Sequence, residues 1–227
     1  MEARLISTAG AASLSMTEIR DAAARDGGTL WLDFDHTDMD SMALLGELID
    51  VRPSDIQECH NRSPVPKMRF YADHHFSAIN GLARGSDGRL YFVPLKLFLT
   101  PKALVTVQGP TSSSLTSEIA RRELAAVRQR VDSGQLLPAS SFELVGAIRA
   151  EEMRTHEDLI TESSARIAQL ERDVSQKDPV KAEALLQDLF DLPDRSAALA
   201  QLLIHAAVAV FPGIQKVAPV AGMAQPA

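Results

Sequence analysis

The stretch RLYFVPLKLFLTPKALVTVQGP, residues 89–110, decides the fold predicted for this chain. Apolar residues dominate both of its halves, and Thr100-Pro101-Lys102 lies between them with the residue types of a tight turn. The stretch therefore predicts one long strand, a short turn and a second strand that returns beside the first.

Shorter patterned segments precede this pair of strands. Strands are expected over residues 67–73 and 74–84, and GSDG at 85–88 is expected to be the next hairpin turn, because its glycines accept positive φ. Further upstream, LWLDF at 30–34 is a compact apolar strand, and apolar residues at helical spacing predict a helix over 39–49. The N-terminal half thus predicts adjacent antiparallel strands.

Helices are expected around and after these strands. A short one over residues 17–28 ends at a Gly-Gly pair, and another is opened by Ser54 and broken by two prolines. Four more follow the hairpin stretch, over residues 113–132, 141–176, 178–192 and 195–211. Strands first and helices afterwards indicate the α+β class: a mixed, largely antiparallel sheet flanked by helices (α/β/α-type), with a C-terminal helical layer.

Composition divides the chain into three parts. Residues 1–15 are expected to be a flexible N-terminus, and residues 218–227, rich in small residues and proline, a disordered tail. Residues 16–217 are expected to form one domain, with the sheet part over about 28–110 and the helical part over about 111–217.

The overall composition is that of an ordinary globular protein. Hydrophobic residues make up 45% and charged residues 23% of the 227 residues, and the net charge is −7. Eleven basic and 14 acidic side chains give −3 over residues 1–110, and 12 and 16 give −4 over residues 111–227, so no basic stripe indicates nucleic acid. Cys59 is the one cysteine, which rules out an intrachain disulfide and fits a reducing compartment.

We expect the chain as written to be soluble and cytoplasmic. Its N-terminus lacks the continuous apolar region of a signal peptide. The longest apolar-rich run, AALAQLLIHAAVAVF at 197–211, spans 15 residues, whereas a bilayer requires about 20. This run is therefore interpreted as a core or interface helix.

In their order and spacing, these motifs resemble the cytosolic domain of the CorA-type divalent-cation transporters. LWLDF occupies the position of the family's first strand, Pro66-Lys67 matches a Pro-Lys step before its middle strands, and PLKLFLTPKALVTVQ at 94–108 matches its last pair of strands. The resemblance extends over residues 28–217 and implies a mixed sheet with helices on both faces.

The resemblance implies the cytosolic regulatory domain of a magnesium (divalent metal ion) transporter. The family's stalk helix, its two membrane spans and the Gly-Met-Asn signature of its pore find no match here, since Gly222-Met223 is followed by Ala224. We therefore expect a domain that is not transport-competent alone and is not an enzyme. Family members are homopentamers held largely by those parts, which implies a monomer or weak oligomer for this chain. Joined to a pore, it would lie at the cytoplasmic face of the membrane.

The resemblance also implies a magnesium-sensing site between neighbouring subunits. The family uses an acidic residue near the hairpin turn together with one on the stalk helix, and Asp87 in GSDG is the matching position. Mg²⁺ prefers oxygen ligands and keeps much of its hydration shell, so carboxylates of two subunits can share one hydrated ion. Asp87 is the one metal-binding residue predicted, with Mg²⁺ weakly bound and no cofactor tightly bound. The alternative is that Asp87 merely favours a Gly-flanked turn.

An enzyme is the rival hypothesis. Asp33-Phe34-Asp35-His36-Thr37 follows a strand and matches the D-x-D-x-T pattern of haloacid-dehalogenase-like phosphatases. In that family the first aspartate attacks phosphorus and the second acts as acid and base beside Mg²⁺, roles that would fall here to Asp33 and Asp35. The competing interpretation is the start of a helix capped by Thr37, with acidic residues near its positive end. A third hypothesis is a non-transporting binding module of the same fold.

Two further patterns have ordinary explanations. Cys59-His60 and His74-His75 suggest zinc, but neighbours on a strand point to opposite faces and no zinc-ligand spacing is present. The acidic residues of the long helix, Glu151, Glu152 and Glu157 among them, are interpreted as a solvated face with pairs such as Glu162–Arg166.

Overall fold

The computed structural model describes residues 1–25, 27–62 and 65–175. The chain divides into two compact units, Met1–Ile160 and Thr161–Ala227. The first unit holds every described strand, and the described part of the second unit is the end of one helix.

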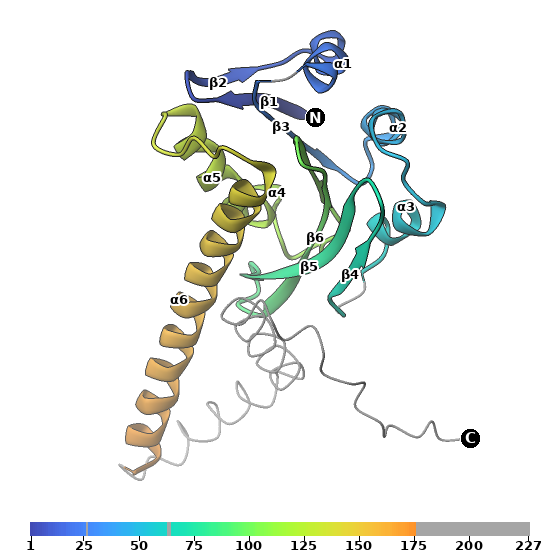
Figure 1. Cartoon of the computed structure of the whole chain (residues 1–227). Coiled ribbons are helices and arrows are strands. Elements are labelled where there is room, and N and C mark those ends of the chain that lie inside the picture. Colours follow the sequence, from blue (N-terminus) through green and yellow to red (C-terminus); the bar gives the residue numbers. More distant parts are fainter. Residues whose placement is uncertain (26, 63–64, 176–227) are drawn as a thin grey trace, which may run out of the picture. The chain divides into compact units, whose positions relative to one another are not determined.

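A seven-stranded sheet of order β2-β1-β3-β7-β6-β5-β4 forms the centre of the first unit (Figure 1). Its strands are β1 Glu2–Ser7, β2 Gly10–Ser13, β3 Thr29–Asp35, β4 Lys67–Phe70, β5 His75–Arg84, β6 Leu90–Leu99 and β7 Ala103–Gln108. Neighbouring strands are antiparallel except β3 and β7, which run parallel. The prediction of a mixed, largely antiparallel sheet is confirmed.

The strands β6 and β7 are the two predicted from residues 89–110. They pair antiparallel up to Leu99 opposite Leu104, and the hydroxyl of Thr100 accepts a hydrogen bond from the Ala103 N–H at 2.9 Å. At its other end, β6 is joined to β5 by the GSDG turn, in which Gly88 has φ of 79°. A side chain at that φ would be strained, which explains the glycine.

Helices cover both faces of this sheet, α1–α3 on one face and α4–α6 on the other (Figure 1). Their bounds are α1 Met16–Ala24, α2 Met39–Leu48, α3 Pro53–Cys59, α4 Ser117–Ala120, α5 Arg122–Asp132 and α6 Ser141–Ser175. The long helix predicted over 141–176 is therefore confirmed as α6.

Strand β3 shows how both faces come to be buried. Successive side chains of a strand point to opposite faces. Leu30, Leu32 and Phe34 pack in the core beneath α1–α3, whereas Trp31 packs in the core beneath α5 and α6. Asp33 shares the face of Trp31 and is equally buried, so a carboxylate lies on this covered face, where Arg121 donates a hydrogen bond to it.

The N-terminal residues differ from the expectation of a flexible segment. Residues 2–13 form the β1–β2 hairpin, and β1 pairs antiparallel with β3. Ile6 is fully buried in the core beneath α5 and α6. The glycine and alanines of this segment give it little strand preference of its own, and the hydrogen bonds and burial come from β3. The prediction of a flexible segment is wrong for residues 2–13.

Two helix boundaries also need correction. Helix α3 begins at Pro53 with Arg52 as its N-cap, not at Ser54, because proline suits the first helical position, where its missing N–H leaves nothing unpaired. The helix predicted over 113–132 divides at Arg121 into α4 and α5. The helices predicted over 178–192 and 195–211, the tail and the domain boundary at residue 217 lie outside the described residues.

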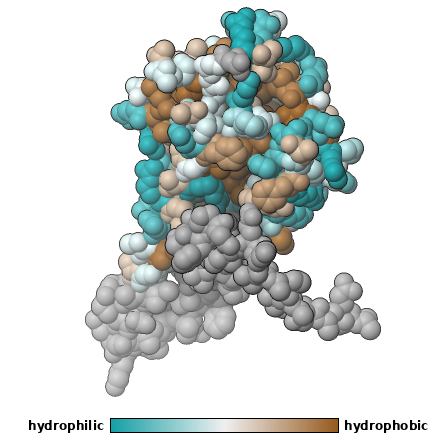
Figure 2. Space-filling view, viewed as in Figure 1, coloured by the Kyte–Doolittle hydropathy of each residue, from teal (hydrophilic) through white to brown (hydrophobic). Residues whose placement is uncertain are grey.

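None of the described helices is long and apolar enough to cross a membrane. On the face drawn in Figure 2, apolar side chains form brown patches among hydrophilic ones. The large apolar side chains that are exposed include Met68 and Phe70 of β4, at 56% and 57%. Since β4 is the last strand in the sheet order, this edge of the sheet presents apolar surface.

Candidate functional site

Asp87 lies at the exposed tip of the β5–β6 hairpin, where the resemblance places a metal-sensing carboxylate. Its Oδ1 accepts the N–H of Arg89 at 3.1 Å, and its Oδ2 accepts the hydroxyl groups of Tyr91 and Ser114. The hydrogen bond from Tyr91 lowers the pKa of Asp87, and the Arg89 N–H and charge act in the same direction. Asp87 is thus an ionised carboxylate held in a fixed orientation at the surface.

The hairpin tip is itself anchored. The Ser86 N–H donates to the Ser114 carbonyl at 3.0 Å, which ties the turn to the segment before α4. At Gly85, a Cβ would lie 2.7 Å from the Tyr91 ring and 2.8 Å from Asp87 Oδ1. Glycine is therefore required at this position for Tyr91 and Asp87 to meet.

Asp33, the nucleophile of the rival phosphatase hypothesis, is 2% exposed in the middle of the sheet. Its Oδ1 accepts the Thr106 hydroxyl at 2.7 Å, and its Oδ2 accepts hydrogen bonds from Arg121 at 3.1 Å and from Arg128. Burial raises the pKa of Asp33, while Arg121, Thr106 and Arg128 oppose the rise. Two guanidinium groups occupy the space that an attacking carboxylate would need for phosphate and metal.

Asp35 is also held away from such chemistry. Its Oδ1 accepts the backbone N–H of Thr37 at 3.0 Å and the Thr37 hydroxyl at 2.8 Å, which is a local turn. The cap of α2 is Asp38 and not Thr37 as predicted, since Asp38 Oδ1 accepts the Ser41 N–H at 3.1 Å. The D-x-D-x-T match therefore combines a buried ion-paired carboxylate with a turn before a helix.

The cysteine and histidines of the zinc pattern have separate surroundings. Cys59, the last residue of α3, is buried and its thiol donates to the Asp55 carbonyl, and burial raises the pKa of this thiol to about 12. His74 is buried beside Tyr71, whereas His75 packs on Phe70. Within the described ranges, no group of three or more histidine, cysteine or acidic side chains is arranged to hold a metal ion.

A buried lysine was not predicted. Lys96 of β6 is fully buried and faces α3, where Asp55 pairs with Arg69 and Glu58 pairs with Lys67. Burial lowers the pKa of Lys96, and the nearby Glu58 carboxylate opposes this. A lysine within the apolar pattern LKLFL is a signal in the sequence, because alternation on a strand places it on a covered face.

The acidic face of α6 was predicted to be solvated, and this prediction is wrong for one of its residues. Glu152 is 4% exposed, which corrects its assignment to a solvated face. Its carboxylate accepts a hydrogen bond from Arg149 at 2.6 Å. The sequence signal was the spacing: Leu144, Ile148, Glu152 and His156 follow one another at intervals of four, and all of them are buried.

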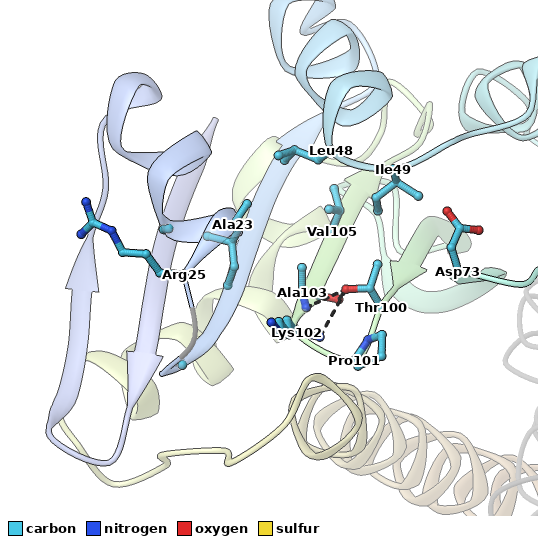
Figure 3. Close-up of a pocket in the computed structure, with 13 residues that line it drawn as sticks. Ala23, Arg25, Leu48, Ile49, Asp73, Thr100, Pro101, Lys102, Ala103 and Val105 are labelled. Atoms are coloured by element: carbon cyan, nitrogen blue, oxygen red, sulfur yellow. Dashed lines mark hydrogen bonds between the residues drawn. The ribbon is translucent and has the colours of Figure 1, made fainter.

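A pocket of about 290 Å³ opens between α1, α2 and the beginnings of β3 and β7 (Figure 3). Its walls are mainly apolar, with Leu48, Ile49 and Val105, and Asp73 and Lys102 add charge. This volume is at the lower end for small-molecule sites. None of the residues predicted from the sequence to bind or react lines it.

The family model described as CorA-like Mg2+ transporter protein matches residues 26–209. No curated protein matches the chain.

Solved structures share the fold. The full-length CmaX protein superimposes with a TM-score of 0.67 at 14% identity, over 91% of this chain and 60% of that one. The soluble domain of CorA from Methanocaldococcus jannaschii gives 0.65 at 15% identity, over 96% and 81%. The complete CorA magnesium transporter from the same organism gives 0.71 at 12% identity, over 97% and 64%. The chain thus spans less than two thirds of the two full-length proteins.

Proposed function

This chain belongs to the CorA-like Mg2+ transporter family, and we propose that it is the cytosolic regulatory portion of such a transporter. The observation that carries the proposal is the family match over residues 26–209, which includes the whole described sheet apart from β1 and β2. In this proposal the chain lies at the cytoplasmic face of a membrane and does not move ions alone.

We propose that the chain does not catalyse a covalent reaction. Asp33, the one candidate nucleophile, is buried and paired with two arginines, which supports this. The alternative of a non-transporting binding module stays a prediction, and no feature of the described site favours it.

The regulatory step we propose is the sensing of Mg²⁺ by Asp87 at a contact between copies of the chain. The support is the exposed, ionised and oriented carboxylate at the hairpin tip. Because its oxygens already accept hydrogen bonds, Asp87 suits a hydrated ion that it contacts through water. Carboxylates of neighbouring copies would repel each other without the ion, so its binding favours association.

The test is sedimentation velocity of the chain with and without millimolar Mg²⁺. We expect Mg²⁺ to increase the sedimentation coefficient of the wild type and of Asp21→Asn, a control that removes an exposed carboxylate from α1. Asp87→Asn should abolish the increase. A response of Asp87→Asn equal to that of the wild type would remove Asp87 from the proposal, and the absence of any Mg²⁺ response would count against metal regulation.

A further inference from the structure

The buried stripe of α6 changes character along its length. Leu144 and Ile148 are apolar and fully buried. The next two positions at the same spacing of four residues are Glu152 and His156, and they are buried as well. All four belong to the first unit. An ionisable carboxyl group therefore occupies a position where the helix packs on the rest of the unit.

The space around Glu152 contains one described cation that favours its charge. Arg149, on its own helix, is its hydrogen-bond partner at 2.6 Å. On the side of β5, a Cβ at Gly81 would lie 4.0 Å from Glu152 Oε1, so the sheet presents backbone and apolar side chains there, Ala83 and Val93 among them. This face of the sheet offers the carboxylate no charged partner among the described contacts.

A second carboxylate approaches from α5. Glu123 is buried and accepts hydrogen bonds from Thr155 at 3.0 Å and from Arg122 at 3.2 Å. His156, one turn along α6, is the other titratable group on the buried stripe. Burial first, and then the charge of Glu123, raise the pKa of Glu152 to about 7, and Arg149 opposes them.

We propose that Glu152 is a proton-dependent latch that holds the first half of α6 on the sheet when it is neutral and loosens it when it is ionised. The neutral carboxyl carries no charge into this buried position near Gly81, whereas the ionised one places a buried negative charge near the Glu123 carboxylate. The proposed latch goes beyond metal sensing, because it makes the packing of α6 on the sheet depend on pH near neutrality.

The direction of the pH effect follows from linkage. A carboxyl whose pKa in the folded chain is above its unfolded value stabilises the fold fully below that unfolded value, and this contribution is lost as pH rises through the folded pKa. For Glu152 the window runs from 4.5 to about 7. The equilibrium for opening of α6 should therefore rise by up to about tenfold for each pH unit in this window and level off above it.

The experiment measures hydrogen exchange of the α6 amides and thermal melting, in chelator-containing buffer at about pH 5.5 and 8. The single tryptophan, Trp31, lies in the same core as Leu144 and Ile148 and reports on melting. Wild type should open more and melt lower at the higher pH. Glu152→Gln, which keeps the shape and removes the charge, should lose most of this difference and exceed the wild type in stability at pH 8.

Two controls separate the latch from its neighbours. Glu157→Gln removes an exposed carboxylate from the same helix and should keep the wild-type pH difference, as should His156→Gln, which replaces the other buried polar side chain of the stripe. An undiminished pH difference in Glu152→Gln overturns the proposal. Should that variant not fold, NMR titration of side-chain ¹³C-labelled glutamate in the wild type decides: a carboxyl titrating near pH 7 supports the latch, and none above about 5.5 overturns it.

Discussion

At the scale of single residues, Asp33, Lys96 and Glu152 are buried charged groups that are balanced differently. Asp33 has two arginines and a hydroxyl, Lys96 has the nearby Glu58, and Glu152 has one arginine and an opposing carboxylate. A carboxylate with two cationic partners resists change, whereas one with a carboxylate neighbour is poised to take up a proton. We therefore assign Asp33 to holding the fold.

Replacing Asp33 by Asn should lower the free energy of unfolding, because Asp33 holds the fold together and is not a catalytic residue in our proposal. The change leaves Arg121 and Arg128 facing a neutral group in a largely buried layer, and breaking such a pair costs about 3 kcal/mol of unfolding free energy. Urea denaturation measures the loss. The matched control Asp35→Asn, at a half-exposed position, should cost less than about 1 kcal/mol. Equal stability of the two variants would contradict this assignment.

The same positions show why a local motif misleads. The pattern D-x-D-x-T spans five residues, but the arginines that determine the role of Asp33 lie 88 and 95 positions further along the chain. Their approach depends on α4 and α5 packing on the face opposite to α1–α3. Neither composition nor spacing contains that information. The role of Asp33 could therefore be assigned only once the packing of the helices on the two faces of the sheet was known.

At the scale of elements, the turns of the β5–β6–β7 segment carry most of the predictable structure. GSDG and TPK are local signals, and the strands on both sides are apolar enough to pair in one register. By contrast, β1 and β2 obtain their stability from β3, so their short sequence carried no comparable signal. Elements defined by their own residues were predictable, and those defined by a distant partner were not.

Two glycine-to-alanine changes should act in opposite directions. Gly85→Ala places a methyl group against the Tyr91 ring and Asp87, and we expect a loss of about 1–3 kcal/mol in unfolding free energy from this overpacking. Gly46→Ala, inside α2 with nothing within 4 Å of the new methyl group, should gain about 0.5–1 kcal/mol. Chemical denaturation midpoints measure both, and a Gly85→Ala variant as stable as Gly46→Ala would disprove the close packing of the turn.

At the scale of the whole molecule, the order of elements indicated the fold class, because strands in hairpin succession followed by helices allow few arrangements. The structure confirms the mixed sheet with helices on both faces. The order of elements could not predict which charged side chains are buried between the sheet and the helices, as Lys96 and Glu152 are. Buried charges depend on which face each side chain meets, and this follows from the assembled sheet.

Without metal, we expect the chain to be a monomer or weak oligomer. Strand β4, the last strand of the described sheet, carries the exposed side chains of Met68 and Phe70, a surface that favours weak pairing of copies. Sedimentation velocity over a concentration series in chelator should show a sedimentation coefficient that rises only at high concentration. Met68→Ser with Phe70→Ser should suppress this rise, whereas Met39→Ser, at a 67% exposed position on α2, should leave it unchanged. A tight pentamer at the lowest concentration would contradict the prediction, since it would show that the chain assembles firmly without Mg²⁺.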